Sequence, residues 1–150
     1  MNKTFGVIGG DRRQAELARR LAADGNTVYT YGLGAWKPGG EGTLGRAAAA
    51  EAVILPLPLC RGDGVLNCEE GAVPTADLFR RLHPGQMILA GQVKPQQRQE
   101  AAVCGLTLED YFLREELTVA NAAATAEAAI QVAMEQLDRT LLGMPCLVLG

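Results

Sequence analysis

Short apolar runs alternate with helical segments at the start of the chain, and this alternation restricts the fold more than any other feature. The run Phe5–Gly9 is followed by apolar positions at helical spacing from Gln14 to Ala22, and then by the β-branched and aromatic segment Thr27–Tyr31. A strand, a helix and a second strand in this order are typical of a βαβ unit, whose two strands are parallel. We therefore expect residues 1–31 to form such a unit.

The later segments continue the pattern. Ala52–Leu57 is a continuous apolar run, which is typical of a strand buried on both faces of a parallel sheet, and Pro56 should mark its end. The glycine-rich segment Gly32–Gly45 is expected to be a mobile loop. Further strands are expected at Met87–Ala90, Leu106–Leu108, Leu117–Val119 and Cys146–Gly150, and helices at Arg46–Glu51, Pro74–Leu82, Pro95–Cys104 and Thr125–Leu142.

Strands that alternate with helices predict an α/β fold with a doubly wound, mainly parallel sheet of about five strands. Ligands of such sheets bind where the strands end, near the point at which the strand order reverses. The segments that follow the strands are therefore the candidate ligand-binding segments: Gly10–Gln14, Gly32–Gly45, Leu57–Asn67 and Gly91–Lys94.

Charge and cysteine content exclude several classes of function. The chain has 14 Lys and Arg against 17 Asp and Glu, so it offers no broad basic surface for nucleic acid. No apolar run approaches the length of a membrane span, and the N-terminus lacks a signal-peptide pattern, so we expect a cytoplasmic protein. Four scattered cysteines and one histidine provide neither zinc-ligand spacing nor a redox pair, so we expect buried, reduced thiols and no metal site.

The turn after the first expected strand lies where a dinucleotide-binding fingerprint would be found. That fingerprint needs glycine at its first, third and sixth positions, whereas the turn has Gly9, Asp11 and Gln14 there. A carboxylate at Asp11 would also repel a pyrophosphate, so we expect no nucleotide here and interpret Asp11 as a helix N-cap. Arg12 and Arg13 could bind the carboxylates of a small dicarboxylate or could be a solvated helix face.

Two further segments contain candidate site residues. Pro56 and the loop with Asp63, Gly64 and Asn67 could hold a ligand, or the loop could be a plain Gly-Asp-Gly turn. His83 precedes Pro84 and Gly85 and is expected in a turn, not as a general base.

The start of the expected long helix allows two interpretations. Thr125 is expected to cap this helix, with Glu127 in its first turn. Alternatively, Asn121, Thr125 and Glu127 form a polar cluster on an alanine-rich face that contacts another domain or another protomer.

Several of these motifs, in the same order, resemble the A subunit of dipicolinate synthase. The resemblance rests on Val7–Asp11 with Arg13 and Gln14, Ile54–Pro56, Gly62–Val65, Asn121 with Thr125–Glu127, and Leu147–Gly150. It implies an oxidoreductase of spore-forming bacteria that forms dipicolinate from a dihydrodipicolinate-type intermediate with NADP or NAD, together with the B subunit of dipicolinate synthase. It also implies a flavodoxin-like (Rossmann-like) three-layer sandwich that provides one wall of the substrate cleft, in the cytoplasm of the mother cell.

On this resemblance, residues 1–142 are the substrate-side domain and residues 143–150 begin a truncated nucleotide-binding domain. Only Gly150 would belong to the cofactor site, so this chain alone is expected to bind no cofactor and to be inactive. The expected substrate-binding residues are Asp11, Arg12, Arg13, Gln14, Pro56, Asp63, Gly64, Asn67, Asn121, Thr125 and Glu127.

The chain departs from the family pattern at Ala122–Ala124 and Ala128, where the family has serine, proline and glycine. The alternative hypothesis is a non-catalytic interaction or oligomerisation module that associates through the alanine-rich helix, and a homo-oligomer is expected on either hypothesis.

Overall fold

The computed structural model describes residues 2–37, 42–62 and 64–149. The chain divides into two compact units, Met1–Leu113 and Arg114–Gly150, and each is described by itself. No described helix is both long enough and apolar enough to cross a membrane.

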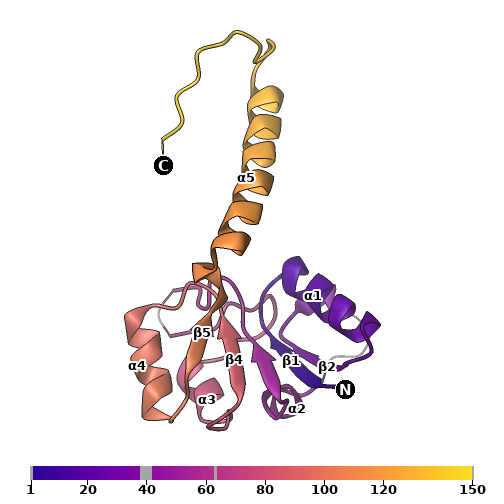
Figure 1. Ribbon diagram of the computed structural model, residues 1–150, viewed down its shortest axis with the longest axis vertical. Coiled ribbons are helices and arrows are strands. Elements are labelled where there is room, and N and C mark those ends of the chain that lie inside the picture. The colour runs from indigo at the N-terminus through magenta and orange to yellow at the C-terminus, as the bar shows by residue number, and fades with distance from the viewer. Residues whose placement is uncertain (1, 38–41, 63, 150) are drawn as a thin grey trace. The chain divides into compact units, whose positions relative to one another are not determined.

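The first unit is built on one sheet of five parallel strands, which confirms the predicted α/β fold class (Figure 1). The strands are β1 (Thr4–Ile8), β2 (Thr27–Tyr31), β3 (Ala52–Ile54), β4 (Met87–Ala90) and β5 (Leu108–Asp110). Their order in the sheet is β2-β1-β3-β4-β5, so the strand order reverses at β1. Because connections between parallel strands are right-handed, this reversal places the connecting helices on opposite faces of the sheet. All five strands end at the same edge, which we call the carboxyl edge.

Helices connect the strands, and local side chains determine where most of them begin or end. They are α1 (Arg12–Ala23), α2 (Leu44–Ala48), α3 (Thr75–Phe79) and α4 (Pro95–Val103), with short 3-10 turns at Gly34–Trp36 and Tyr111–Leu113. The Thr43 hydroxyl accepts a hydrogen bond from the Arg46 N–H and caps α2, while Gly105 ends α4 with a φ of +71°.

The core of this unit is aliphatic and lies against the sheet. Val53, Leu55 and Ile88 are among its buried members, and β3 is buried along its whole length, as predicted for a central parallel strand. Small residues let the layers approach closely: a Cβ on Gly6 of β1 would lie 1.9 Å from the carbonyl oxygen of Ala47 in α2.

Two strand boundaries differ from the prediction. The edge strand is Leu108–Asp110, not Leu106–Leu108, because the Leu106 N–H donates to the Ala101 carbonyl and completes the C-terminal cap of α4. The strand predicted at Ala52–Leu57 ends at Ile54, and Pro56 has no N–H to continue the ladder.

The segment predicted as a loop at Gly32–Gly45 contains a 3-10 turn, and α2 already begins at Leu44, before the helical turn predicted at Arg46–Glu51. Leu33, which is fully buried, attaches this segment to the core.

The second unit contains one long helix, α5 (Glu115–Gln136). Two predictions fail here: the strand expected at Leu117–Val119 lies inside α5, and the helix expected at Thr125–Leu142 begins and ends earlier. β-Branched residues favour a strand only where a neighbouring strand is available, whereas the alanines of this segment favour a helix. The strand expected at Cys146–Gly150 is also absent from the described residues 146–149, where no partner strand is present.

Candidate ligand site at the carboxyl edge of the sheet

The turn between β1 and α1 forms the centre of the carboxyl edge. The Gly9 N–H donates to the Tyr31 carbonyl at 2.7 Å, and the Gly10 N–H donates to the Asn67 carbonyl at 2.6 Å. Asp11 caps α1 as predicted: its carboxylate accepts from the Arg13 N–H at 2.9 Å, and the Gln14 side-chain oxygen accepts from the Asp11 N–H at 3.4 Å. The turn is therefore held by both neighbouring loops and by its own cap.

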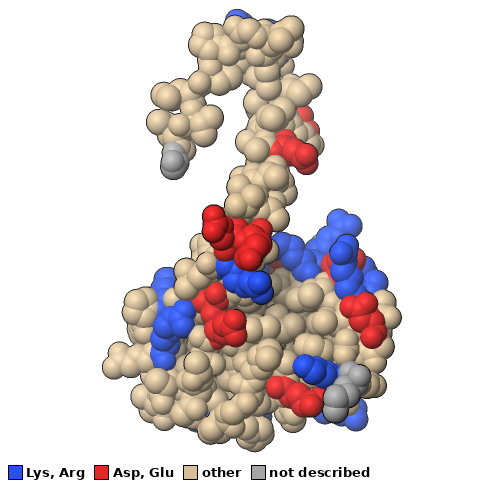
Figure 2. Space-filling model, in the orientation of Figure 1, with Lys and Arg blue, Asp and Glu red and all other residues tan. Residues whose placement is uncertain are grey.

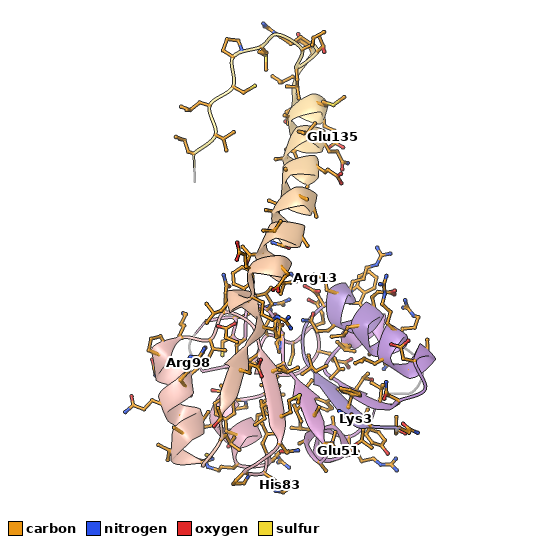
Figure 3. All side chains as sticks on the ribbon, in the orientation of Figure 1. Lys3, Arg13, Glu51, His83, Arg98 and Glu135 are labelled. Atoms are coloured by element: carbon orange, nitrogen blue, oxygen red, sulfur yellow. The ribbon has the colours of Figure 1, made fainter. Side chains whose placement is uncertain are left out.

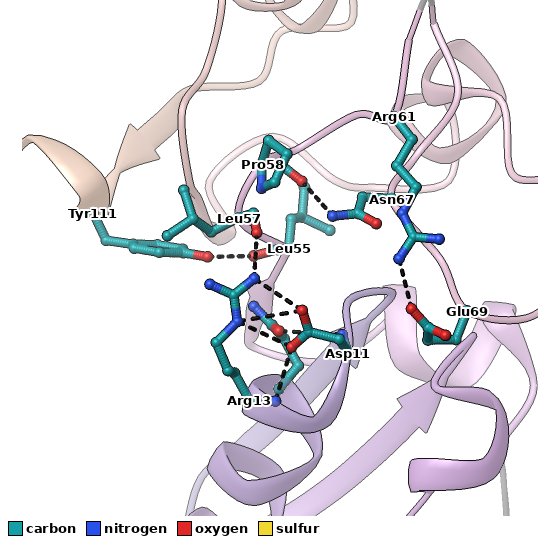
Figure 4. A network of polar contacts seen from close by, with 10 residues as sticks. Asp11, Arg13, Leu55, Leu57, Pro58, Arg61, Asn67, Glu69 and Tyr111 are labelled. Carbon is teal, nitrogen blue, oxygen red and sulfur yellow. Dashed lines mark hydrogen bonds and ion pairs between the residues drawn. The ribbon is translucent and has the colours of Figure 1, made fainter. Parts of the chain in front are cut away.

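Asp11 and Arg13 form an ion pair at this turn (Figure 4). Arg13 Nε lies 3.0 Å from Asp11 Oδ1, and Nη2 lies 2.9 Å from Oδ2. The hydrogen bonds from the Arg13 guanidinium hold the pKa of Asp11 below its ordinary value, and the pKa of Arg13 is raised by the same partner. Arg13 Nη2 also donates to the Leu57 carbonyl at 2.9 Å, so one side chain joins the loops after β1 and β3.

Tyr111 joins the end of β5 to the same region. Its hydroxyl donates to the Leu55 carbonyl at 3.0 Å (Figure 4), and burial raises its pKa to about 12. Gly91, after β4, lies between Leu57 and Tyr111: a Cβ at this position would be 2.7 Å from the Leu57 Cβ and 3.0 Å from a ring carbon of Tyr111. The segments that follow β1, β3, β4 and β5 are therefore packed and hydrogen-bonded into one surface.

The loop between β3 and α3 is fastened mainly through its backbone. Asn67 is buried, its Nδ2 donates to the Pro58 carbonyl at 3.1 Å, and its Oδ1 is buried without a hydrogen-bond partner among the described atoms. The Gly64 carbonyl accepts from the Thr75 N–H at 2.8 Å at the start of α3. Asp63, the third predicted residue of this loop, lies outside the described residues.

Two cavities adjoin this surface. One, of about 450 Å³, lies beside the ends of β3, β4 and β5, and its lining includes Pro58, Cys60, Gln92, Lys94, Gln97 and Asp110. The other, of about 330 Å³, shares Lys94 and Gln97 with it and also includes Gly62, Gly64, Gln96 and Glu100. The sequence analysis identified Gly91–Lys94 as a segment that follows a strand, but it singled out neither Lys94 nor Asp110 nor Tyr111.

Asp110 organises the wall of the larger cavity. Its carboxylate accepts from the backbone N–H groups of Gln92, Val93 and Phe112 at 3.1, 2.8 and 3.0 Å, and Arg98 lies 3.7 Å away. Gln92 has a φ of +54°, a conformation that few residues other than glycine adopt, and the Asp110 carboxylate holds it there.

The predicted site residues separate into three groups. Asp11, Arg13, Gln14 and Asn67 meet at the carboxyl edge, and the buried Pro56 contributes its carbonyl to the Gly91 N–H at 3.1 Å. Arg12 points elsewhere, because its guanidinium lies over the Trp36 ring, 5.8 Å from the ring centroid.

The third group, Asn121, Thr125 and Glu127, belongs to the separate unit that contains α5. Thr125 is not a cap and Glu127 is not in a first turn, because both lie within the helix; the Thr125 hydroxyl donates to the Asn121 carbonyl at 2.8 Å.

The arrangement at α1 does not fit a dinucleotide. The Asp11 carboxylate occupies the helix N-terminus, where a pyrophosphate would bind, and the Gln14 side chain covers Gly10, whose Cβ would lie 2.6 Å from Gln14 Cδ. No group of His, Cys, Asp or Glu among the described residues could hold a metal ion. The four cysteines are free thiols, but the expectation that they are buried is correct only for Cys68: Cys60 and Cys104 are partly exposed and Cys146 is exposed.

On the face shown in Figure 2, acidic and basic side chains of the first unit are interspersed, with no broad basic surface.

His83 lies in a turn, as predicted, at the edge opposite Arg13 (Figure 3). Its backbone N–H donates to the Gln86 side-chain oxygen at 2.6 Å.

Comparisons with known proteins show the family to which the chain belongs. The family model for the N-terminal domain of the dipicolinate synthase A subunit matches residues 4–112. The A subunit of dipicolinate synthase from Bacillus subtilis (strain 168) is 28% identical over 153 residues, which cover 96% of this chain and 52% of that relative.

Two solved structures have the same fold. The A chain of dipicolinate synthase from Bacillus subtilis matches with a TM-score of 0.74 and 23% identity over 93% of this chain and 50% of that one. The A subunit of dipicolinate synthase from Bacillus halodurans matches with a TM-score of 0.74 and 21% identity, again over 93% of this chain and 50% of that one. The chain thus spans about half the length of these relatives. The match over residues 4–112 confirms the resemblance, and the chain belongs to the family of N-terminal domains of the dipicolinate synthase A subunit.

Proposed function

We propose that this chain is the substrate-side domain of an oxidoreductase of the dipicolinate synthase A type and provides one wall of its substrate cleft. The observation that carries the proposal is the family match over residues 4–112, which includes the whole sheet and every segment at its carboxyl edge. Ligands of parallel α/β sheets bind at this edge, and here it carries the exposed guanidinium of Arg13, and two cavities lie along the same edge.

The ligand that this edge fits is a small dicarboxylate. The Arg13 side chain is 57% exposed, and its hydrogen bonds to Asp11 and Leu57 use Nε and Nη2, so Nη1 has no hydrogen-bond partner among the described residues. A guanidinium held in place by its neighbours binds a carboxylate at a small entropic cost, because its own conformation is already fixed. In this proposal Asp11 and Gln14 position Arg13, and Asn67 supports the loop beside it.

The chemistry of the whole enzyme would need a nicotinamide cofactor, NADP or NAD, and this would be held by a separate nucleotide-binding domain. The β1–α1 turn does not fit that role, as its Asp11 cap shows. The proposal further places the protein in the cytoplasm of the mother cell of a spore-forming bacterium, where it forms dipicolinate together with the B subunit of dipicolinate synthase.

Calorimetric titration tests the proposal directly. We expect pyridine-2,6-dicarboxylate to bind the chain at low salt and NADP not to bind. Arg13→Ala should weaken binding about tenfold or more, because it removes a charge-assisted contact. Arg80→Ala is the matched control, since Arg80 is also exposed and paired with a nearby aspartate, Asp77. Unchanged affinity in Arg13→Ala, or no binding by the wild-type chain, would refute the proposal.

One observation favours a second function, association through α5. None of the 22 residues of α5 is buried, although the helix carries exposed Val119, Ile130, Val132 and Met134. A helix with apolar residues on its surface gains stability when another surface covers them, and we propose a second copy of the chain as that surface. Sedimentation velocity should show a dimer that Ile130→Glu dissociates and the neighbouring Gln131→Glu does not; a monomeric wild-type chain would exclude this role.

A further inference from the structure

The larger cavity at the carboxyl edge is bounded by three of the four segments that carry the polar network. Pro58 and Cys60 follow β3, Lys94 and Gln97 follow β4, and Phe112 follows β5. Its volume of about 450 Å³ is within the range of small-molecule sites, and Pro58 and Phe112 give it apolar walls against which a planar ring can pack.

The cavity contains one acidic side chain, Asp110, whose carboxylate is already bound to other groups of the protein. The Asp110 side chain is only 5% exposed, and its carboxylate accepts three backbone N–H groups and lies near Arg98. Glu100, in the adjoining cavity, accepts from the Thr75 hydroxyl at 3.3 Å and from Gln96 at 3.3 Å.

The charge of Lys94, by contrast, has no ion-pair partner among the residues that the structure describes. Its side chain is exposed and lines both cavities, and among the described residues its ammonium group forms no hydrogen bond or ion pair. An ammonium group between two cavities, with the neighbouring carboxylates bound to other donors, attracts an anion to this position.

The cavity adjoins the loop that Arg13 holds, although Arg13 itself is not among the residues that line it. Arg13 Nη2 donates to the Leu57 carbonyl, and the next residue, Pro58, lines the cavity. Two cationic partners match the two charges of a dicarboxylate, and Arg12 is directed away from this role, because its guanidinium packs on Trp36.

We propose that Lys94 is the second cation of the ligand site: the cavity receives the ring of a small planar dicarboxylate, Lys94 binds one of its carboxylates and Arg13 the other. The inference rests on the proposed function for the identity of the ligand, and it adds the residue and the cavity that hold it.

Cys60 provides a reporter inside the same cavity. It is partly exposed, and the modification of its thiol can be followed by peptide mass mapping, separately from the other three cysteines. We would measure its reaction rates with an anionic aromatic disulfide, 5,5′-dithiobis(2-nitrobenzoate), and with neutral iodoacetamide. The same thiolate attacks both reagents and displaces thionitrobenzoate from one and iodide from the other, so the ratio of the two rates cancels any change in the fraction of Cys60 that is ionised.

Lys94→Gln should lower the ratio of anionic to neutral rates about threefold or more at low salt, and the difference should shrink as salt is added. Lys3→Gln is the matched control: it removes the same charge at the opposite edge of the sheet (Figure 3) and should leave the ratio unchanged. An unchanged ratio in Lys94→Gln would overturn the inference.

Protection experiments separate this inference from the proposed function. Pyridine-2,6-dicarboxylate should slow the iodoacetamide reaction of Cys60 in the wild-type chain, and Lys94→Gln should largely remove this protection while Lys3→Gln retains it. Calorimetric binding without protection of Cys60 would overturn the inference and leave the proposed function standing. Absence of calorimetric binding would refute the proposed function and the inference with it.

Discussion

The contact between α2 and β1 leads to the sharpest stability prediction. A Cβ added at Gly6 would lie 1.9 Å from the carbonyl oxygen of Ala47 and 2.8 Å from its carbonyl carbon, whereas ordinary contacts begin at 3.4 Å. In Gly6→Ala the helix must therefore move away from the sheet by about 1.5 Å, since the obstacle is backbone and cannot rotate aside.

The cost follows from what that movement disrupts. Ala47 and Ala48 are buried against the sheet, so a displaced α2 opens a gap in the core that the new methyl group does not fill. Overpacking of this kind costs about 1–3 kcal/mol and more where the backbone must shift, so we expect a loss of about 3 kcal/mol. With a urea m-value of about 2 kcal/mol/M, the midpoint should fall by about 1.5 M.

Urea unfolding followed by the fluorescence of Trp36, the single tryptophan, reports on the first unit alone. Gly45→Ala is the matched control, because Gly45 is in α2 itself and a Cβ there meets nothing within 4 Å. It should leave stability unchanged or raise it by up to about 1 kcal/mol, as helical glycine-to-alanine changes do. A Gly6→Ala midpoint within about 0.3 M of the wild-type value would refute the close approach of α2 to β1.

Three other predictions concern polar groups. Gln86→Ala should destabilise the first unit by about 2 kcal/mol in urea unfolding, because the Gln86 Nε2 donates to the carbonyls of Ala48 and Ala50, and exposed Gln96→Ala should cost much less. The pKa of Asp11 is lowered in the folded state, so the ionised carboxylate contributes its full stability above the ordinary pKa of 3.8, and this contribution is lost as the pH falls below that value. Asp11→Asn keeps an N-cap, so the difference in unfolding free energy between wild type and this variant should shrink from pH 7 to pH 3. A difference that is independent of pH would contradict this prediction. In an alkaline absorbance titration of the three tyrosines, one should ionise near pH 12, and Tyr111→Phe should remove that step and no other.

Local signals explain which elements could be predicted. Asp11 and Gln14 are three residues apart and belong to one helix start, so the cap of α1 is visible in the sequence. The same holds for β3, whose burial on both faces is expressed in an unbroken apolar run.

The predictions were wrong or incomplete where contacts between residues far apart in the sequence determine the structure. The β-branched residues near Val119 favour a strand, but no strand of the described part of the chain pairs with them, and the neighbouring alanines continue the helix. At the candidate site, the bond from Arg13 to Leu57 joins residues 44 apart and the bond from Tyr111 to Leu55 joins residues 56 apart. No periodicity or motif encodes such pairs. Arg13 and the segment Gly91–Lys94 could be proposed from their places after strands, whereas Tyr111 could not.

The network at the carboxyl edge also has a consequence for how this domain can diverge. Arg13, Asn67 and Tyr111 donate to the main-chain oxygens of Leu57, Pro58 and Leu55, and every residue type carries such an oxygen. The accepting positions are therefore free to vary in side chain without loss of these bonds, whereas each donor must keep its hydrogen-bonding group. Evolution can consequently reshape the apolar lining of the edge, and with it the choice of ligand, while the same three donors hold the loops in register.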